Sequence, residues 1–152
     1  MLIVSAATSC SVEPASPKYF EPRGVVYVSP EFSAEQSEIV MGAMSTWQSA
    51  TDGEVAFDVR IGKGHPLVRP AVERDRINGE FILSDEPEIA LDTTKAFDPR
   101  SLRNLTLHEL GHALGLEHIE RSESVMFPFA TTVQELDAWT LAAWQARSQS
   151  RR

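Results

Sequence analysis

The chain has 152 residues, 42% of them hydrophobic and 24% charged, a composition typical of one soluble globular domain. Its net charge of −8 argues against a nucleic-acid partner, because proteins that bind nucleic acid carry basic surfaces. The single cysteine, Cys10, excludes an intramolecular disulfide, and no apolar run approaches the roughly 20 residues of a transmembrane helix. We therefore expect a monomeric domain that neither binds nucleic acid nor spans a membrane.

Residues 1–23 form a predicted N-terminal extension. An apolar start, Met1–Val4, is followed by small residues that lead to Cys10. Two interpretations stay open: the remnant of a secretion or lipoprotein signal, with a lipid anchor at Cys10, or an extension without a targeting role. The first predicts a secreted, extracellular protein or a lipoprotein of the cell envelope. A folded domain over 24–147 and a polar tail over 148–152 complete the predicted organisation.

The N-terminal half of the folded domain mixes strands with one helix. The predicted elements, in chain order, are a strand at Val25–Val28, a helix over about 34–50, and strands over 55–61, 81–83 and 89–91. Ser33 and Gln36 match the capping box that begins a helix. Residues 55–61 alternate apolar and polar side chains, as a half-buried strand does, whereas 67–77 stays ambiguous. This order predicts an α+β fold with an α/β-like N-terminal half.

Two helices are predicted in the C-terminal half. Asp98 at the N-cap and Pro99 at the first helical position begin a helix that Gly115 ends. The segment Thr132–Glu135 matches another capping box, so we expect the last helix to begin there and to fray after Arg147.

The chemistry is concentrated in the predicted helix that Gly115 ends. His108 and His112 are four residues apart and therefore share one helix face, and a turn at Gly115 can return His118 to the same point. Three neutral imidazoles can hold a zinc ion and leave its fourth position to water, as in catalytic zinc sites. Glu109 lies about 100° further round the helix, where it can act as general base rather than ligand. The spacing predicts one catalytic zinc.

The segment His108–His118, HELGHALGLEH, resembles the HExxHxxGxxH signature of the metzincin zinc metallopeptidases. Ser124–Pro128 resembles the Met-turn that follows this signature, and the spacing is most similar to the matrixins, in particular to a minimal, bacterial-type catalytic domain. The resemblance implies a zincin-like fold: a twisted mixed sheet with two long helices, a zinc cleft, a Met-turn with Met126 beneath the metal, and a C-terminal helix.

The resemblance also implies an activity. It predicts a zinc metalloendopeptidase that hydrolyses protein or peptide substrates through a zinc-bound water activated by Glu109. The alternative is a catalytically inactive zinc-binding module that presents its cleft to a peptide or protein partner. A third hypothesis, a helix that merely resembles the motif, predicts no zinc.

The matrixin resemblance places a pocket for the substrate side chain that follows the scissile bond. Its implied wall is Phe127, Pro128, Phe129 and Ala130, and its floor is Asn104. Because this wall is apolar, we expect an apolar substrate residue there, such as Leu or Met.

Five further acidic or histidine positions complete the predicted sites. Asp137 either braces the Met-turn, as the resemblance implies, or is an exposed helix acid. His65 is predicted to be a solvated loop histidine, so we expect no second, structural zinc. Calcium stays open, with Asp85, Asp92 and Asp98 as its candidate ligands.

Overall fold

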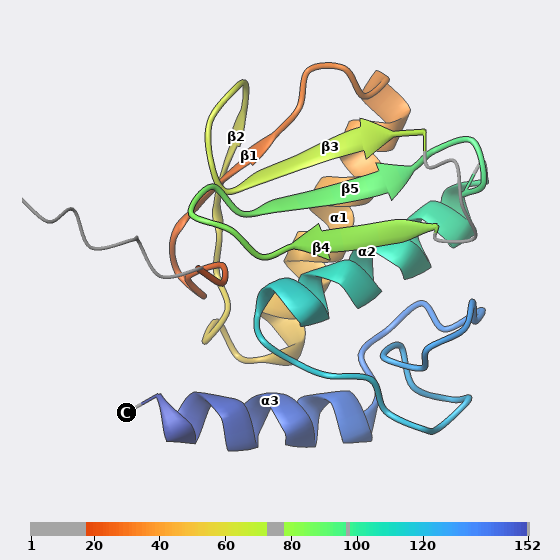
Figure 1. Ribbon diagram of the computed structural model, residues 1–152. Helices are drawn as coiled ribbons and strands as arrows, with labels where there is room; N and C mark the ends of the chain where they lie inside the picture. Colours follow the sequence, from red (N-terminus) through yellow and green to blue (C-terminus); the bar gives the residue numbers. More distant parts are fainter. Residues whose placement is uncertain (1–17, 73–77, 97, 152) are drawn as a thin grey trace, which may run out of the picture.

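The computed structural model describes residues 18–72, 78–96 and 98–151. Figure 1 shows one sheet in this part of the chain, with the strand order β2-β1-β3-β5-β4. The strands are β1 (Val25–Val28), β2 (Asp58–Ile61), β3 (Leu67–Ala71), β4 (Gly79–Ile82) and β5 (Glu88–Asp92). The helices are α1 (Ala34–Ala50), α2 (Pro99–Ala113) and α3 (Ala138–Ser150). The predicted α+β class with a mixed sheet is thus confirmed.

The sheet is parallel except at one edge. β1 pairs in parallel with β2 and with β3, and β3 pairs in parallel with β5. β4 runs antiparallel to β5 and forms the edge of the sheet that lies beside α2 (Figure 1). The edge strand β4 therefore keeps one side of its backbone free of strand partners among the described residues.

Strand β3 accounts for residues 67–71 of the stretch that the sequence left ambiguous, while 73–77 lie outside the described residues. Proline has no backbone N–H, which argues against a central strand, and Pro70 stands inside this one. The register explains the exception, because β1 pairs with β3 only at Leu67 and Val68. Among the described strands Pro70 pairs with Leu91 of β5 and with no residue of β1. Its missing N–H therefore leaves no carbonyl of β1 without a hydrogen-bond donor.

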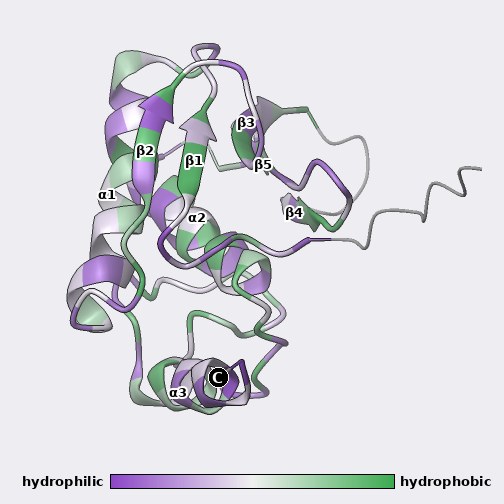
Figure 2. Ribbon diagram, turned by 90° about the vertical axis from the view of Figure 1, so that its left-hand side faces the viewer, coloured by the Kyte–Doolittle hydropathy of each residue, from purple (hydrophilic) through white to green (hydrophobic). Residues whose placement is uncertain are grey.

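Helices α1 and α2 pack together on one face of the sheet, as Figures 1 and 2 show. α1 begins with the predicted capping box: the N–H of Gln36 donates to Oγ of Ser33 at 3.1 Å, and the N–H of Ser33 donates to Oε1 of Gln36 at 2.9 Å. Trp47, fully buried, donates from Nε1 to the Leu107 carbonyl of α2 and meets Trp144 of α3 edge-on. This tryptophan pair ties α3 to the rest of the core.

The last helix begins later than its sequence predicts. α3 starts at Ala138 with Asp137 as N-cap, so the capping box at Thr132–Glu135 was a wrong prediction. The Gln134 side chain donates instead to the Arg100 carbonyl, which holds this segment in a non-helical conformation against α2. α3 also continues through Ser150, beyond the expected fraying point.

The ordered packing begins before residue 24. Phe20, in the predicted extension, is fully buried, and its N–H donates to the Ala113 carbonyl at 2.8 Å. At the second predicted strand, β2 covers only Asp58–Ile61, while Val55 is buried ahead of it. The candidate lipid site Cys10 lies outside the described residues. No described helix is both long and apolar enough to cross a membrane.

Candidate active site

Helix α2 presents the first two histidines, and its C-terminal turn returns the third. Asp98 caps the helix by accepting from the N–H groups of Arg100 and Ser101. At the other end Gly115 has a φ of 91°, and the N–H groups of Gly115 and Leu116 donate to the His112 and Gly111 carbonyls. This is the hydrogen-bond pattern of a Schellman turn, which needs a left-handed residue. Because the chain reverses there, His118 comes back to the helix face.

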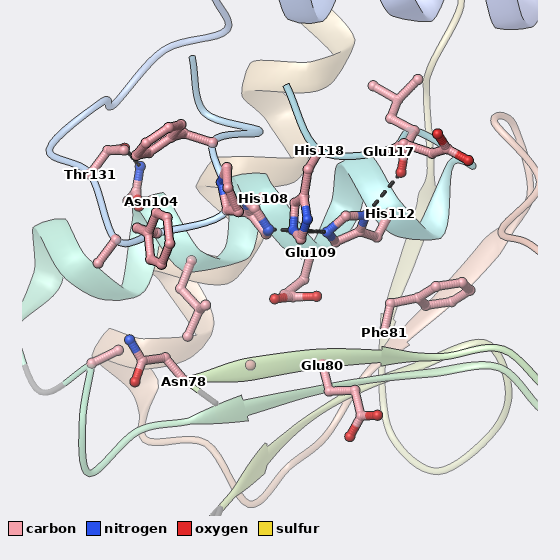
Figure 3. A pocket seen from close by; sticks show the side chains of 18 of the residues that line it. Asn78, Glu80, Phe81, Asn104, His108, Glu109, His112, Glu117, His118 and Thr131 are labelled. Carbon is pink, nitrogen blue, oxygen red and sulfur yellow. Dashed lines mark hydrogen bonds between the residues drawn. The ribbon is translucent and has the colours of Figure 1, made fainter. Parts of the chain in front are cut away.

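The three imidazoles converge on one point (Figure 3). Nε2 of His112 lies 3.0 Å from Nε2 of His108 and 3.1 Å from Nε2 of His118. Nδ1 of His108 lies 2.7 Å from the Val125 carbonyl, and Nδ1 of His112 lies 2.9 Å from the Leu116 carbonyl. A carbonyl only accepts, so Nδ1 carries the proton in both rings and each Nε2 keeps its lone pair.

This donor set fits a zinc ion. Among the described residues these histidines form the one group of potential ligands whose donor atoms all lie within 4.8 Å of one another. Zinc–nitrogen bonds of roughly 2.0–2.1 Å in a tetrahedron separate two ligand nitrogens by about 3.3 Å, close to the spacing seen here.

Burial keeps two of the ligands neutral. It lowers the pKa of His108 to about 4, and it also lowers the pKa of His112. Hydrogen bonds to the backbone carbonyls act in the opposite direction in both cases, while neighbouring imidazoles reinforce the lowering. At neutral pH both rings are therefore uncharged, with Nδ1 protonated and Nε2 free to bind a metal.

Glu109 is buried between α2 and the edge strand β4, with 4% of its surface exposed. Burial raises its pKa to about 8; a hydrogen bond from the Phe81 backbone lowers the pKa, and the charge of Glu80 raises it. A positive charge held by the histidines would favour the ionised form. β4 makes room for this carboxylate at Gly79, where an added Cβ would lie 3.1 Å from Oε1 of Glu109 and 2.9 Å from Leu105.

Met126 is fully buried beneath the histidines' helix, in contact with Gly111. A Cβ at Gly111 would clash with Sδ of Met126, so the helix accommodates the methionine only because residue 111 has no side chain. The N–H of Met126 donates to Oγ of Ser124 at 3.1 Å. The thioether therefore supports the helix face one residue before His112.

Asp137 braces the segment that contains Met126. Its Oδ2 accepts from the N–H of Val125 at 2.9 Å, and its Oδ1 accepts from the N–H of Thr140 at 2.9 Å. Burial raises the pKa of this carboxyl, but the hydrogen bonds outweigh it, and the net shift is downward. Of the two interpretations left open by the sequence, the structure shows the brace. The carbonyl of Val125 accepts from Nδ1 of His108, so Asp137 is linked through residue 125 to a candidate ligand.

A cleft of about 1020 Å³ runs past the histidines between α2 and β4. All five predicted pocket residues line it: Asn104, Phe127, Pro128, Phe129 and Ala130. Phe129 is 72% exposed at its rim. Nδ2 of Asn104 donates to Oγ1 of Thr131 and to the Val133 carbonyl, at 3.0 and 2.6 Å. Both amide hydrogens are thus engaged with the wall segment, so Asn104 ties the wall to α2.

The remaining candidates lie away from the cleft or serve as caps. His65 is on an exposed loop, with Nε2 3.6 Å from Glu86 and Nδ1 3.9 Å from Glu88. Asp92, left open for calcium, accepts from the backbone N–H groups of Thr94 and Lys95. Asp98 is the α2 cap and Asp85 is exposed. Calcium is not evidenced.

Sequence patterns did not indicate several residues of the cleft. Gly79 carried only the Asn-Gly turn signal, and nothing in the sequence assigned Tyr19, Phe81 or Arg147 to a cleft. They come from an N-terminal segment, the edge strand and the last helix, and only the fold brings them together.

These features define a protein of the metzincin-like zinc metallopeptidase group. The fold is similar to the crystal structure of archaemetzincin from Methanopyrus kandleri, with a TM-score of 0.63 and 14% identity. That match covers 84% of this chain and 96% of the archaemetzincin chain. The matrixin family profile matches residues 31–142, and the chain belongs to the matrixin family.

Proposed function

We propose that this protein is a metalloendopeptidase that hydrolyses peptide bonds with Glu109 as general base. The observation that carries the proposal is the burial of an acid beside the three converging imidazoles, in a cleft open to a peptide. A buried carboxyl without a partner charge is costly, so a site that only binds metal has no physical need for it.

His108, His112 and His118 would hold zinc, which supplies Lewis acidity toward the substrate carbonyl and toward water. Glu109 takes the proton from the attacking water and passes it to the amine of the leaving product. Both steps need a carboxyl that can accept and release a proton near neutral pH; burial raises the pKa of Glu109, and a positive charge held by the histidines would lower it again.

The edge strand β4 supports binding of an extended peptide. Its outer side has no strand partner among the described residues, and it lines the cleft opposite α2. A peptide can add to such an edge through backbone hydrogen bonds, and antiparallel addition is the more stable arrangement. Because β4 runs from Gly79 to Ile82, an antiparallel peptide enters at Ile82 and leaves at Gly79, beside Asn104 and Phe129.

The test is Glu109→Gln, which keeps the side-chain volume and removes the proton acceptor. We expect the variant to bind zinc like the parent and to lose peptidase activity on unfolded casein by at least about a hundredfold. The inactive-module hypothesis predicts instead that the parent binds zinc and peptide without any chelator-sensitive cleavage. Turnover of the variant within a few-fold of the parent would show that Glu109 is not the base.

A further inference from the structure

One end of the cleft carries an arginine whose charge no other described side chain neutralises. Arg147, on α3, lines the cleft against Gly115, just after the end of α2. No ion pair joins it to another described residue, and its guanidinium donates none of the hydrogen bonds found among them. Its Nε is buried without a partner. Buried polar groups are paired as a rule, so this exception needs a reason.

The guanidinium is held in place without hydrogen bonds. Its Cζ lies 5.4 Å from the centre of the Tyr19 ring, a cation–π distance. On another side it lies over Gly115, where an added Cβ would come within 2.8 Å of Nε and 3.0 Å of Nη2. Tyr19 in turn stacks on Phe81 of β4, with ring centres 5.9 Å apart. The N–H fork is therefore positioned but unused, the state that suits a carboxylate ligand.

A second positive charge lies near Arg147. Arg151 follows one helical turn later and donates from Nη2 to the Leu114 carbonyl at 3.1 Å. Burial and the charge of Arg147 lower the pKa of Arg151, whereas Glu21 and Tyr19 raise it. Besides Glu109, two acids line the cleft. Glu117 is exposed, so solvent screens its repulsion of an anion, and Glu80 points away from the histidines in Figure 3.

The direction of β4 decides which part of a substrate would meet this end. The stack of Phe81, Tyr19 and Arg147 lies toward the end of β4, whereas Asn104 and Thr131 lie beside its start (Figure 3). An antiparallel peptide therefore passes Arg147 before it reaches the histidines.

We propose that Arg147 is a specificity-determining residue that binds an acidic side chain of the substrate on the N-terminal side of the cleaved bond. This inference rests on the proposed peptidase function for its direction. It adds an ionic subsite to a cleft whose other end is apolar. For an exposed or half-buried ion pair we expect a preference of about two- to five-fold for Glu over Gln at one upstream position.

The experiment compares peptides that differ only by Glu or Gln at successive upstream positions. Their cleavage by the parent gives kcat and KM, and their affinity for zinc-loaded Glu109→Gln protein, measured by fluorescence anisotropy, is independent of turnover. In both assays the Glu peptide should be favoured, through KM rather than kcat, and the preference should shrink at high salt.

Arg147→Gln should abolish the preference while zinc content and melting temperature stay those of the parent. Arg147→Lys should retain part of it, because the charge remains and the planar fork does not. Arg60→Gln is the matched control, since it removes one exposed positive charge from β2, at the opposite edge of the sheet, and should change nothing.

Each outcome separates the inference from the proposed function. Cleavage without a Glu preference, or a preference that survives in Arg147→Gln, overturns the subsite and leaves the peptidase standing. A Glu preference in binding without cleavage by the parent supports the subsite and refutes the peptidase. Failure of the protein to bind any of the peptides refutes both.

Discussion

Asp137 offers the sharpest test of how the metal site is supported, because its two carboxylate oxygens have different tasks. Oδ1 caps α3 through the N–H of Thr140, and Oδ2 accepts from the buried N–H of Val125. Asn is as good an N-cap as Asp, but it carries only one acceptor oxygen. Oδ2 also accepts from the Thr140 hydroxyl at 2.7 Å. Asp137→Asn therefore keeps the cap and leaves the Val125 N–H and this hydroxyl facing an amide, whereas Asp137→Ala removes all three contacts.

The expected destabilisation follows from these contacts. Loss of a helix cap costs about 1 kcal/mol, and an unsatisfied buried N–H costs about 1–3 kcal/mol. We expect a loss in the free energy of unfolding of about 1–3 kcal/mol for Asp137→Asn and of about 2–4 kcal/mol for Asp137→Ala. Urea denaturation measures both. Glu135→Ala, an exposed acid two residues earlier, is the control and should stay within about 0.5 kcal/mol of the parent.

The effect should also reach the metal. The Val125 carbonyl orients His108 through Nδ1, and loss of such an outer contact typically weakens metal binding about 10- to 100-fold. Zinc affinity, measured by competition with a chelator, should therefore fall in both Asp137 variants and not in Glu135→Ala. If Asp137→Asn matched the parent in both stability and zinc affinity, the proposed link from Asp137 through Val125 to His108 would be refuted.

The pH dependence has a definite sign. The pKa of Asp137 is lowered in the folded protein, so its stabilising contribution is complete above the ordinary aspartate value of about 3.9. The contribution is lost as pH falls through the folded pKa. The difference in stability between parent and Asp137→Asn should therefore be constant near neutral pH and shrink in strong acid.

Four further outcomes are expected. Purified protein should contain close to one zinc per chain, and two tightly bound zincs would contradict the assignment of the histidines. Zinc-free protein should lose stability as pH falls from about 6.5 toward 4, because His108 is protonated in this range in the unfolded chain and stays neutral in the folded protein. The free energy of unfolding measured across this pH range tests the prediction. Gly111→Ala should lower the free energy of unfolding by about 1–3 kcal/mol through its clash with Met126, although alanine favours a helix. Met126→Leu should cost under about 1.5 kcal/mol, whereas Met126→Asp should abolish zinc binding. A Gly111→Ala variant more stable than the parent would refute this packing. The parent should cleave before Leu or Met, and Asn104→Ala should broaden this preference because the wall loses its tie to α2; cleavage profiles that stay identical would contradict the tie.

Local sequence patterns predicted the ends of α1 and α2, because hydrogen bonds between nearby residues determine those ends. The capping box at Ser33, the Asp98 cap and the turn at Gly115 each satisfy backbone groups within a few residues, so the sequence alone located α1 and α2. The spacing of His108 and His112 is likewise a property of any helix. This spacing of nearby residues was enough to predict one metal site.

Long-range contacts decided the rest. Pro70 can stand in the sheet because β1 stops pairing with β3 before that residue. α3 begins only at Ala138, because Gln134 bonds to the Arg100 carbonyl of α2. Tyr19 and Arg147 are 128 positions apart in the numbering, and no local pattern relates them. The sequence alone thus determined α1, α2 and the metal-binding motif, whereas the start of α3 and the composition of the substrate cleft depended on which distant segments the tertiary structure packs together.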